Sequence, residues 1–281
     1  MENLTNKSRT VLVTGTSSGI GRGLCKALIE KGYKVFGTVR NKKDAIELKK
    51  EFGVNLDALI VDVTDENQVV RAKDKVENYL RGNLLTALIN NAGIATIGPV
   101  EFLSTTDFKK QIDTKILGTF LCSKIFLPLL GTDQSIISTP GRIVNISSIL
   151  GGKIGSPFMS GYCASKHAVE AFSESLRREL KPYGIKVIIV APGSISTPIW
   201  KTVKEQKDQN KYYKTKYAMP FKRILNSLER FDQNSLPMKE LAKVIIQSIE
   251  SKNPKIRYNP TRDPTQKIWP YIPKKIMDNF F

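Results

Sequence analysis

The chain has 281 residues, of which 41% are hydrophobic and 25% charged, a composition that excludes a disordered chain and indicates an apolar core. Lys and Arg outnumber the acidic residues 44 to 26, for a net charge of +18, yet the lysines are dispersed singly and match no specific nucleic-acid-binding motif. The N-terminus is polar, no apolar run approaches the ~18 residues of a membrane span, and Cys25, Cys122 and Cys163 lack metal-ligand spacing. We therefore expect a cytoplasmic protein with buried thiols and no metal site.

Short, almost wholly apolar runs alternate along the chain with longer amphipathic ones, as in a parallel sheet covered by helices on both faces. The expected strands are Thr10–Thr14, Tyr33–Val39, Leu56–Val61, Thr86–Asn90, Arg142–Ser147 and Lys186–Ala191. The expected helices are Gly19–Lys31, Lys42–Phe52, Asn67–Leu80, Asp107–Leu130, Tyr162–Lys181 and Lys239–Ser251. This order predicts one doubly wound α/β domain of the Rossmann type over residues 1–281, with about seven strands and the ligand at their carboxyl ends.

Two later segments do not fit this alternation. Residues 194–237 are polar and rich in lysine, and an insertion at this point of a doubly wound fold lies over the ligand crevice. We expect a substrate-binding lid there, with a plain surface excursion as the alternative. Residues 265–281 mix aromatic residues with lysines, so this tail either packs over the substrate pocket or lies on a membrane surface.

The first expected strand runs into a glycine-rich stretch, Val11–Gly23, that fits two unrelated kinds of site. Gly15–Gly19 matches the G-x-S-x-G pattern of serine hydrolases, which need a histidine base and an acid beside the serine. His167 is the only histidine and falls inside an expected helix, which argues against a hydrolase. Gly15, Gly19 and Gly21 instead indicate a loop whose backbone approaches a phosphate at a helix N-terminus.

A second motif, YCASK, puts Tyr162 and Lys166 on one face of a helix, because residues four apart are neighbours there. An ammonium beside a phenol favours the phenolate and lowers the phenol pKa from ~10 toward working pH. Tyr162 is therefore predicted to be a general acid/base for an alcohol or carbonyl. The strand GRIVNISS ends in Ser147 and Ser148, and a serine there is placed to hold a carbonyl oxygen beside the phenol.

Six motifs in this order resemble those of the short-chain dehydrogenase/reductase family: TGTSSGIG (14–21), DV (62–63), NNAG (90–93), SS (147–148), YCASK (162–166) and PGSIST (192–197). The resemblance covers about residues 8–200. It implies that Tyr162 exchanges the proton, that Ser148 orients the substrate oxygen, and that Lys166 holds the nicotinamide ribose and lowers the Tyr162 pKa. It also implies a cofactor site formed by Gly15, Ser17, Ser18, Gly19, Ile20, Gly21, Arg40, Asp62, Val63, Asn90, Ala92, Gly93, Tyr162, Lys166, Pro192, Gly193, Ile195 and Thr197.

Two positions depart from the family pattern. Members usually carry an asparagine in the long fourth helix that completes a proton relay, and alignment of DTKILGTF by Gly118 puts Lys115 there instead. A second lysine near Lys166 is expected to lower the phenol pKa further, while the water-binding amide is lost. Ser148 also precedes Tyr162 by fourteen residues where thirteen is commoner, so Ser147 is kept as an alternative.

The end of the second expected strand bears on the cofactor. An acidic residue there would bind the adenosine ribose of NAD and repel a 2′-phosphate, whereas this chain has Arg40 followed by Lys42 and Lys43. We therefore expect a preference for NADP(H). NAD(H) is the alternative, because Arg40 stacked on adenine would suit either cofactor.

The leading hypothesis is an NADP(H)-dependent oxidoreductase that interconverts an alcohol and a carbonyl. The stretches GSISTPIW and WPYIPKKIMD, with Arg257 and Tyr258 between them, resemble the branch that acts on steroids and retinoids, which implies a small lipophilic substrate. The alternative is a cofactor-binding sensor or scaffold of low activity, suggested by Lys115. The family resemblance also implies a homodimer or homotetramer, and contact of the basic C-terminal segment with a membrane stays open.

Overall fold

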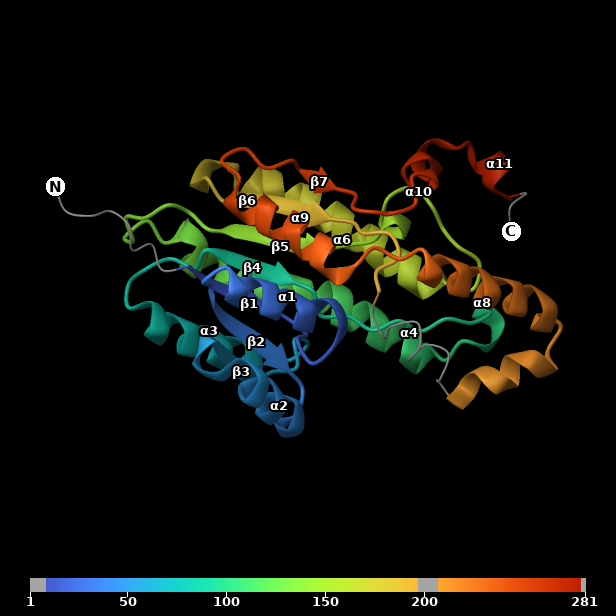
Figure 1. Cartoon of the computed structure of the whole chain (residues 1–281), viewed down its shortest axis with the longest axis horizontal. Helices are drawn as coiled ribbons and strands as arrows, with labels where there is room; N and C mark the ends of the chain where they lie inside the picture. The colour runs from blue at the N-terminus through green and yellow to red at the C-terminus, as the bar shows by residue number, and fades with distance from the viewer. Residues whose placement is uncertain (1–8, 197–206, 279–281) are drawn as a thin grey trace.

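The seven strands form one wholly parallel sheet in the order β3-β2-β1-β4-β5-β6-β7 (Figure 1). The computed structural model describes residues 9–196 and 207–278. The strands are β1 (Thr10–Val13), β2 (Lys34–Val39), β3 (Leu56–Ile60), β4 (Ala87–Asn90), β5 (Arg142–Ile146), β6 (Lys186–Val190) and β7 (Arg257–Tyr258). The doubly wound sheet expected from the apolar runs is confirmed.

The strand order reverses between β1 and β4, which fixes where a ligand can bind. From β1 the chain winds outward to β2 and β3, and then returns to build β4 on the other side. The connections after β1 and β4 therefore leave the sheet in opposite directions and open a crevice at the carboxyl ends of these strands.

Two hydrophobic clusters hold the helices on the two faces of the sheet. On one face pack α1 (Gly19–Glu30), α2 (Lys42–Phe52) and α9 (Met238–Glu250), and on the other α3 (Glu66–Leu80), α5 (Gly118–Leu127) and α6 (Ser160–Glu179). Helix starts follow local capping: the Asn41 side chain accepts from Asp44 N–H, and Asp65 accepts from Gln68 N–H. The buried faces are those predicted by the 3.6-residue period.

The long helix expected over Asp107–Leu130 is present as one helical run over Thr105–Thr132, but it is not α-helical throughout. It consists of α4 (Thr105–Ile112), the π-helical segment η3 (Asp113–Leu117), α5, and a second π-helical segment, η4 (Pro128–Thr132). A π turn inserts one residue per turn and so rotates the side chains that follow it, which a uniform period cannot predict.

This helical run is also the one span of the described residues that is long and apolar enough to cross a membrane. Thr105–Thr132 has 28 residues and a most apolar window of mean hydropathy 1.3, of which 50% is buried inside the protein. Phe126 and Leu129 lie in the hydrophobic cluster under the sheet. Core packing therefore accounts for the apolar character of the run.

The region 194–237 contains helices in its described part. Segment η7 (Lys207–Lys214) and α8 (Ala218–Gln233) extend beyond the sheet beside α4 (Figure 1). Tyr212, Phe221 and Leu225 pack in one cluster with Tyr162. Part of the insertion thus lies next to the predicted catalytic tyrosine, and its role as a substrate-binding lid stays a prediction.

The C-terminal segment packs back onto the body of the protein. It forms α10 (Thr265–Ile268), η8 (Trp269–Tyr271) and α11 (Lys274–Met277). Gln266 is 4% exposed, and its side chain fills the space beside Gly193, where a Cβ atom would approach Gln266 Oε1 to 2.2 Å. The start of the tail therefore supports one end of the ligand crevice.

We predict that Phe126→Ala lowers the free energy of unfolding by about 3–5 kcal/mol, because it leaves a cavity between α5 and the sheet. Phe126 is 1% exposed. The measurement is urea denaturation followed by circular dichroism, with Ile46→Ala, an exposed residue of α2, as the control. Equal effects of the two substitutions would contradict the assignment of this helix to the core.

Candidate active site

A cleft of about 970 Å³ lies at the carboxyl ends of the central strands, where the strand order reverses. Most of the residues predicted for the cofactor site line it: Gly15, Ser17, Ser18, Gly19, Ile20, Arg40, Asp62, Val63, Ala92, Gly93, Tyr162, Lys166, Pro192, Gly193 and Ile195. Ser148 and Lys115 line it as well. Thr197 lies outside the described residues.

The glycine loop brings backbone, rather than side chains, against the cleft. Gly15 and Gly19 have φ angles of +69° and +56°, which side-chain-bearing residues rarely adopt. A Cβ atom on Gly15 would approach Ala92 Cα to 2.8 Å. Ser18, the N-cap of α1, makes no capping side-chain bond, so the first N–H groups of the helix stay available to an anion in the cleft.

Gly21 and Asn90 do not line the cleft, and their positions give them supporting roles. A Cβ atom on Gly21 would meet Gly15 O at 2.1 Å, so this glycine lets α1 pack on the loop. Asn90 Nδ2 donates to Asn145 Oδ1 at 2.8 Å and thereby links β4 to β5 in the core.

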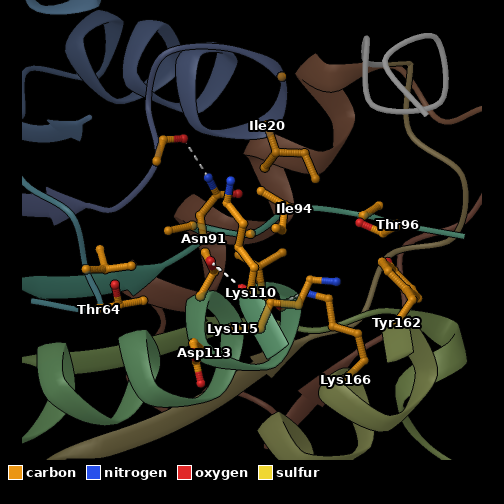
Figure 2. A pocket seen from close by; sticks show the side chains of 18 of the residues that line it. Ile20, Thr64, Asn91, Ile94, Thr96, Lys110, Asp113, Lys115, Tyr162 and Lys166 are labelled. Carbon is orange, nitrogen blue, oxygen red and sulfur yellow. Dashed lines mark hydrogen bonds between the residues drawn. The ribbon is translucent and has the colours of Figure 1, made fainter. Parts of the chain in front are cut away.

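Asn91, which the sequence interpretation did not single out, takes the position facing the cleft. Its Nδ2 donates to Thr14 O and Gly15 O, both at 2.9 Å, and its backbone N–H binds Thr14 Oγ1 (Figure 2). Asn91 therefore fixes the start of the glycine loop. The NNAG motif indicated that an asparagine lies at this site. Which of the two asparagines faces the cleft depends on where β4 ends, and it ends at Asn90.

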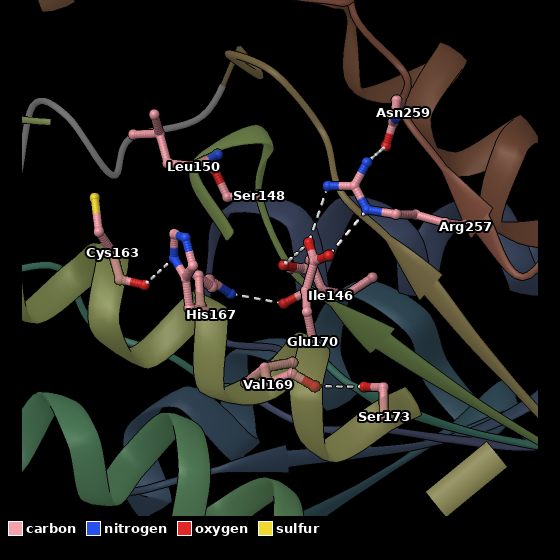
Figure 3. Close-up of polar contacts among 12 residues, drawn as sticks. Ile146, Ser148, Leu150, Cys163, His167, Val169, Glu170, Ser173, Arg257 and Asn259 are labelled. Carbon is pink, nitrogen blue, oxygen red and sulfur yellow. Dashed lines mark hydrogen bonds and ion pairs between the residues drawn. The ribbon is translucent and has the colours of Figure 1, made fainter. Parts of the chain in front are cut away.

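The catalytic residues expected from YCASK are positioned by the end of β5. Three consecutive residues of the chain each hold one turn of α6. Ile146 O accepts from Lys166 Nζ at 2.6 Å, and Ser147 Oγ donates to Glu170 Oε1 at 2.7 Å (Figure 3). Ser148 hydrogen-bonds Tyr162. Tyr162, Lys166 and Glu170 are spaced four residues apart and so share one helix face. Ser148, and not Ser147, is therefore the serine beside the phenol.

Glu170 extends this set of contacts to the edge strand β7. Its two carboxylate oxygens accept from Arg257 Nε at 3.0 Å and Nη2 at 2.9 Å, a two-point ion pair in which both side chains are largely shielded from solvent. Arg257 also contacts Asn259 (Figure 3). Glu170 was missed in the sequence, although its four-residue offset from Lys166 was a usable signal.

Gly151, in the loop between β5 and α6, leaves room for this arrangement. A Cβ atom there would lie 2.3 Å from Ser147 Oγ and 2.9 Å from Glu170 Oε1. The segment between Ser148 and Tyr162 contains two adjacent glycines, Gly151 and Gly152. Because they have no side chains, the loop fits beside the Glu170–Arg257 ion pair.

Burial, rather than the neighbouring ammonium, dominates the protonation of Tyr162. Removal from water raises the pKa of the phenol to about 12, although the hydrogen bond from Ser148 favours the phenolate. Burial likewise lowers the pKa of Lys166 to about 8, against the opposing effect of the Glu170 carboxylate. The expectation that Lys166 lowers the phenol pKa toward neutrality is therefore wrong for the protein alone, and Tyr162 is protonated at neutral pH.

Lys115 lies in the π-helical segment η3, and it is near enough to Lys166 for the two charges to interact. It is 3% exposed, and its Nζ is 3.8 Å from the centroid of the Tyr162 ring. Burial and the charge of Lys166 hold the pKa of Lys115 well below its usual value. Burial and the charge of Lys166 thus both disfavour the expected second positive charge beside the phenol.

Arg40 and Asp62 lie where the second and third strands end. Arg40 is exposed at the rim of the cleft after β2. Asp62 Oδ1 accepts from Thr64 Oγ1 at 2.7 Å, which holds the carboxylate in place at the same rim. His167 Nδ1, by contrast, contacts the Cys163 carbonyl on α6 at 2.8 Å, and it does not line the cleft.

Comparison with known proteins was made against families, curated proteins and solved structures. The family model for short chain dehydrogenases matches residues 9–208. The chain is 32% identical to the NADPH-dependent 3-dehydrocapnine reductase of Ornithobacterium rhinotracheale over 97% of this chain and 96% of that protein. It is 30% identical to human retinol dehydrogenase 5 over 95% of this chain and 86% of that protein.

A solved structure of actinorhodin polyketide ketoreductase with NADPH is also similar. It has a TM-score of 0.74 and 29% identity, over 90% of this chain and 95% of that one. The parallel sheet with helices on both faces agrees with this similarity of fold. The chain belongs to the short-chain dehydrogenase/reductase family and is an NAD(P)-dependent oxidoreductase.

Proposed function

We propose that the protein is an NADP(H)-dependent reductase that converts a lipophilic carbonyl compound to its alcohol. The observation that carries this proposal is the hydrogen-bonded pair Ser148–Tyr162 inside a cleft whose other end is a glycine loop at a helix N-terminus. A proton donor and an anion-binding loop thus share one cavity.

The residues present fit a dinucleotide. The N-terminal N–H groups of α1 suit a pyrophosphate, and the missing side chain of Gly15 leaves room for close approach of the backbone. The Lys166 amine donates to Ile146 O and, as an ammonium, keeps further N–H groups for a ribose hydroxyl. When bound, the nicotinamide supplies the hydride.

Tyr162 is suited to act as the proton donor when a carbonyl is reduced. A phenol with a pKa near 12 carries its proton at neutral pH and can donate it to the oxygen of a carbonyl as that oxygen becomes negative. Ser148 hydrogen-bonds the phenol and is placed to orient the same substrate oxygen. Lys166 stabilises the phenolate that remains after proton transfer, provided that its amine is protonated.

A lipophilic substrate is supported by the apolar surroundings of Tyr162, of which Ala95 also lines the cleft. Ala95, Ile97, Met159, Phe221 and Leu225 form a buried apolar cluster that includes the tyrosine ring. The relatives named as a retinol dehydrogenase and a 3-dehydrocapnine reductase are consistent with this class, and the second name also matches the proposed direction.

The preference for NADP(H) is supported by the rim of the cleft after β2. Arg40 lines this rim and is exposed, as a partner for a 2′-phosphate would be. The relative from Ornithobacterium is named as NADPH-dependent. NAD(H) is the alternative that the kinetic comparison below tests.

Assembly and location are further parts of this proposal. Leu117 and Phe120 are 38% and 43% exposed on η3 and α5, an apolar surface that a homodimer or homotetramer would cover. Ile268, Tyr271 and Ile276 are exposed in the basic C-terminal segment, as expected for contact with a membrane surface. A cytoplasmic location is proposed from the composition.

We predict that Tyr162→Phe lowers NADPH-dependent reduction of retinoid, steroid or long-chain ketone substrates by about 10²–10⁴-fold, because the proton donor is lost. Absorbance at 340 nm measures turnover, and NADPH fluorescence serves as the control for retained cofactor binding. Tight NADPH binding with no turnover by the unmodified protein on this panel would instead support the sensor or scaffold alternative.

We predict that the KM for NADPH is lower than that for NADH, and that Arg40→Ala raises the KM for NADPH about tenfold while changing that for NADH much less. Loss of one charged contact to a 2′-phosphate gives this difference. Steady-state kinetics with both cofactors measures it, and Lys50→Ala, outside the cleft lining, is the control. A clear preference for NADH would refute the cofactor assignment.

We predict that Glu170→Gln moves the alkaline limb of the kcat/KM profile to lower pH by roughly half a unit to one unit. Lys166 has a pKa of about 8, and the Glu170 carboxylate raises it, so its removal deprotonates the amine at lower pH. Glu174→Gln, one turn further along α6 and paired with exposed Arg178, should leave the profile unchanged. Identical profiles for Glu170→Gln and the unmodified protein would exclude this coupling.

A further inference from the structure

Lys115 is a buried amine without a hydrogen-bond partner among the described residues. Burial of an amine without an acceptor is costly, and such groups are rare unless a ligand or water satisfies them. The amine lies inside the same cleft as Tyr162, 3.8 Å from the centroid of its ring. A place for an acceptor therefore exists beside the proton donor.

The Lys115 side chain occupies space that is left free by the missing side chain of Gly93. A Cβ atom on Gly93 would lie 3.2 Å from Lys115 Cε and 3.4 Å from its Cγ, so the glycine gives the side chain its path. Figure 2 shows the amine directed toward the gap between Tyr162 and Lys166, and away from Asp113. Asp113 is paired with Lys109 at 2.6 Å on the outer side of the helix.

No carboxylate of the described residues forms a hydrogen bond with the Lys115 amine. Glu170, the acidic group nearest to Lys166 on α6, is held by Ser147 and Arg257. Lys166 itself donates to Ile146 O and supports Tyr162, so its role is already defined. The described residues give Lys115 no acceptor, and its place in the cleft lining leaves room for one on a bound molecule.

We propose that Lys115 binds an anionic group of the substrate, a carboxylate or a comparable oxyanion, located a few bonds from the carbonyl that Tyr162 protonates. This inference rests on the proposed reductase function and narrows its substrate class to lipophilic carbonyl compounds with an acidic group. A protonated amine in a buried position binds an oxyanion through short, charge-assisted hydrogen bonds.

The charge of Lys115 would then depend on the substrate. The groups that face its amine are Tyr162, Cys163 and Lys166, all from α6, and none of them is a carboxylate. An oxyanion would offset the burial and the repulsion by Lys166 that now hold the pKa of Lys115 low, and would raise it. Binding of an acidic substrate should therefore weaken as the pH rises and the amine loses its proton.

The test compares matched acids and esters. Long-chain 2-oxo and 4-oxo carboxylic acids and their methyl esters are used as substrates, with NADPH, for the unmodified protein, Lys115→Met and Lys124→Met. We expect the unmodified protein to favour at least one acid over its ester by tenfold or more in kcat/KM. Lys115→Met should reduce that ratio to about one. Lys124 is an exposed residue of α5, and Lys124→Met should leave the ratio unchanged. Thermal unfolding checks the variants, and Lys115→Met should raise Tm because it removes an unpaired buried amine.

Each other outcome is decisive. An unchanged ratio in Lys115→Met, equal loss of acid and ester turnover, or no preference for any acid in the unmodified protein would overturn the inference while leaving the reductase function intact. If no substrate is turned over, the proposed function fails, and calorimetric titration of the same oxo acids and esters into the protein with NADP+ still tests Lys115. Tighter binding of an acid than of its ester, lost in Lys115→Met, supports the inference, and equal binding of acid and ester overturns it. Lys115→Gln replaces Lys115→Met if the latter does not fold.

Discussion

The site depends on the register between the end of β5 and one face of α6. Ile146, Ser147 and Ser148 are consecutive, yet they bind Lys166, Glu170 and Tyr162, three turns of a single helix. One contact uses the Ile146 carbonyl and two use serine hydroxyls, so the strand cannot slip by one residue without losing all three. This register, and not the tyrosine–lysine spacing alone, sets the distance between the proton donor and the serine that orients it.

Polar groups gather at this point at a cost to stability. Tyr162 and both lysines are almost fully buried, and burial moves each of their pKa values toward the neutral form. The Glu170 carboxylate opposes that effect for Lys166, whereas the described residues give Lys115 no such partner. A protein accepts such groups where they serve a ligand, and the same substitutions that relieve the cost are expected to impair function.

Side-chain contacts link the edge strand β7 to the helix that carries the predicted catalytic residues. Arg257 lies on β7, the last strand, and its ion pair with Glu170 joins this strand to the helix that carries Tyr162 and Lys166. Beyond β7, Gln266 packs against Gly193 at the end of the cleft. The C-terminal part of the chain, where the family motifs end, thus supports the geometry that those motifs define.

The sequence by itself determined the fold and most of the cleft lining, because apolar runs, helix periods and glycine positions are local properties. The glycine loop, Tyr162, Lys166 and Arg40 could all be read from their neighbours in the chain. Only the tertiary structure decided that Ser148 rather than Ser147 meets the phenol and that Asn91 faces the cleft. It also decided the contacts of Glu170 and the directions in which the pKa values of Tyr162 and Lys115 shift, because burial and contacts between distant segments set those properties.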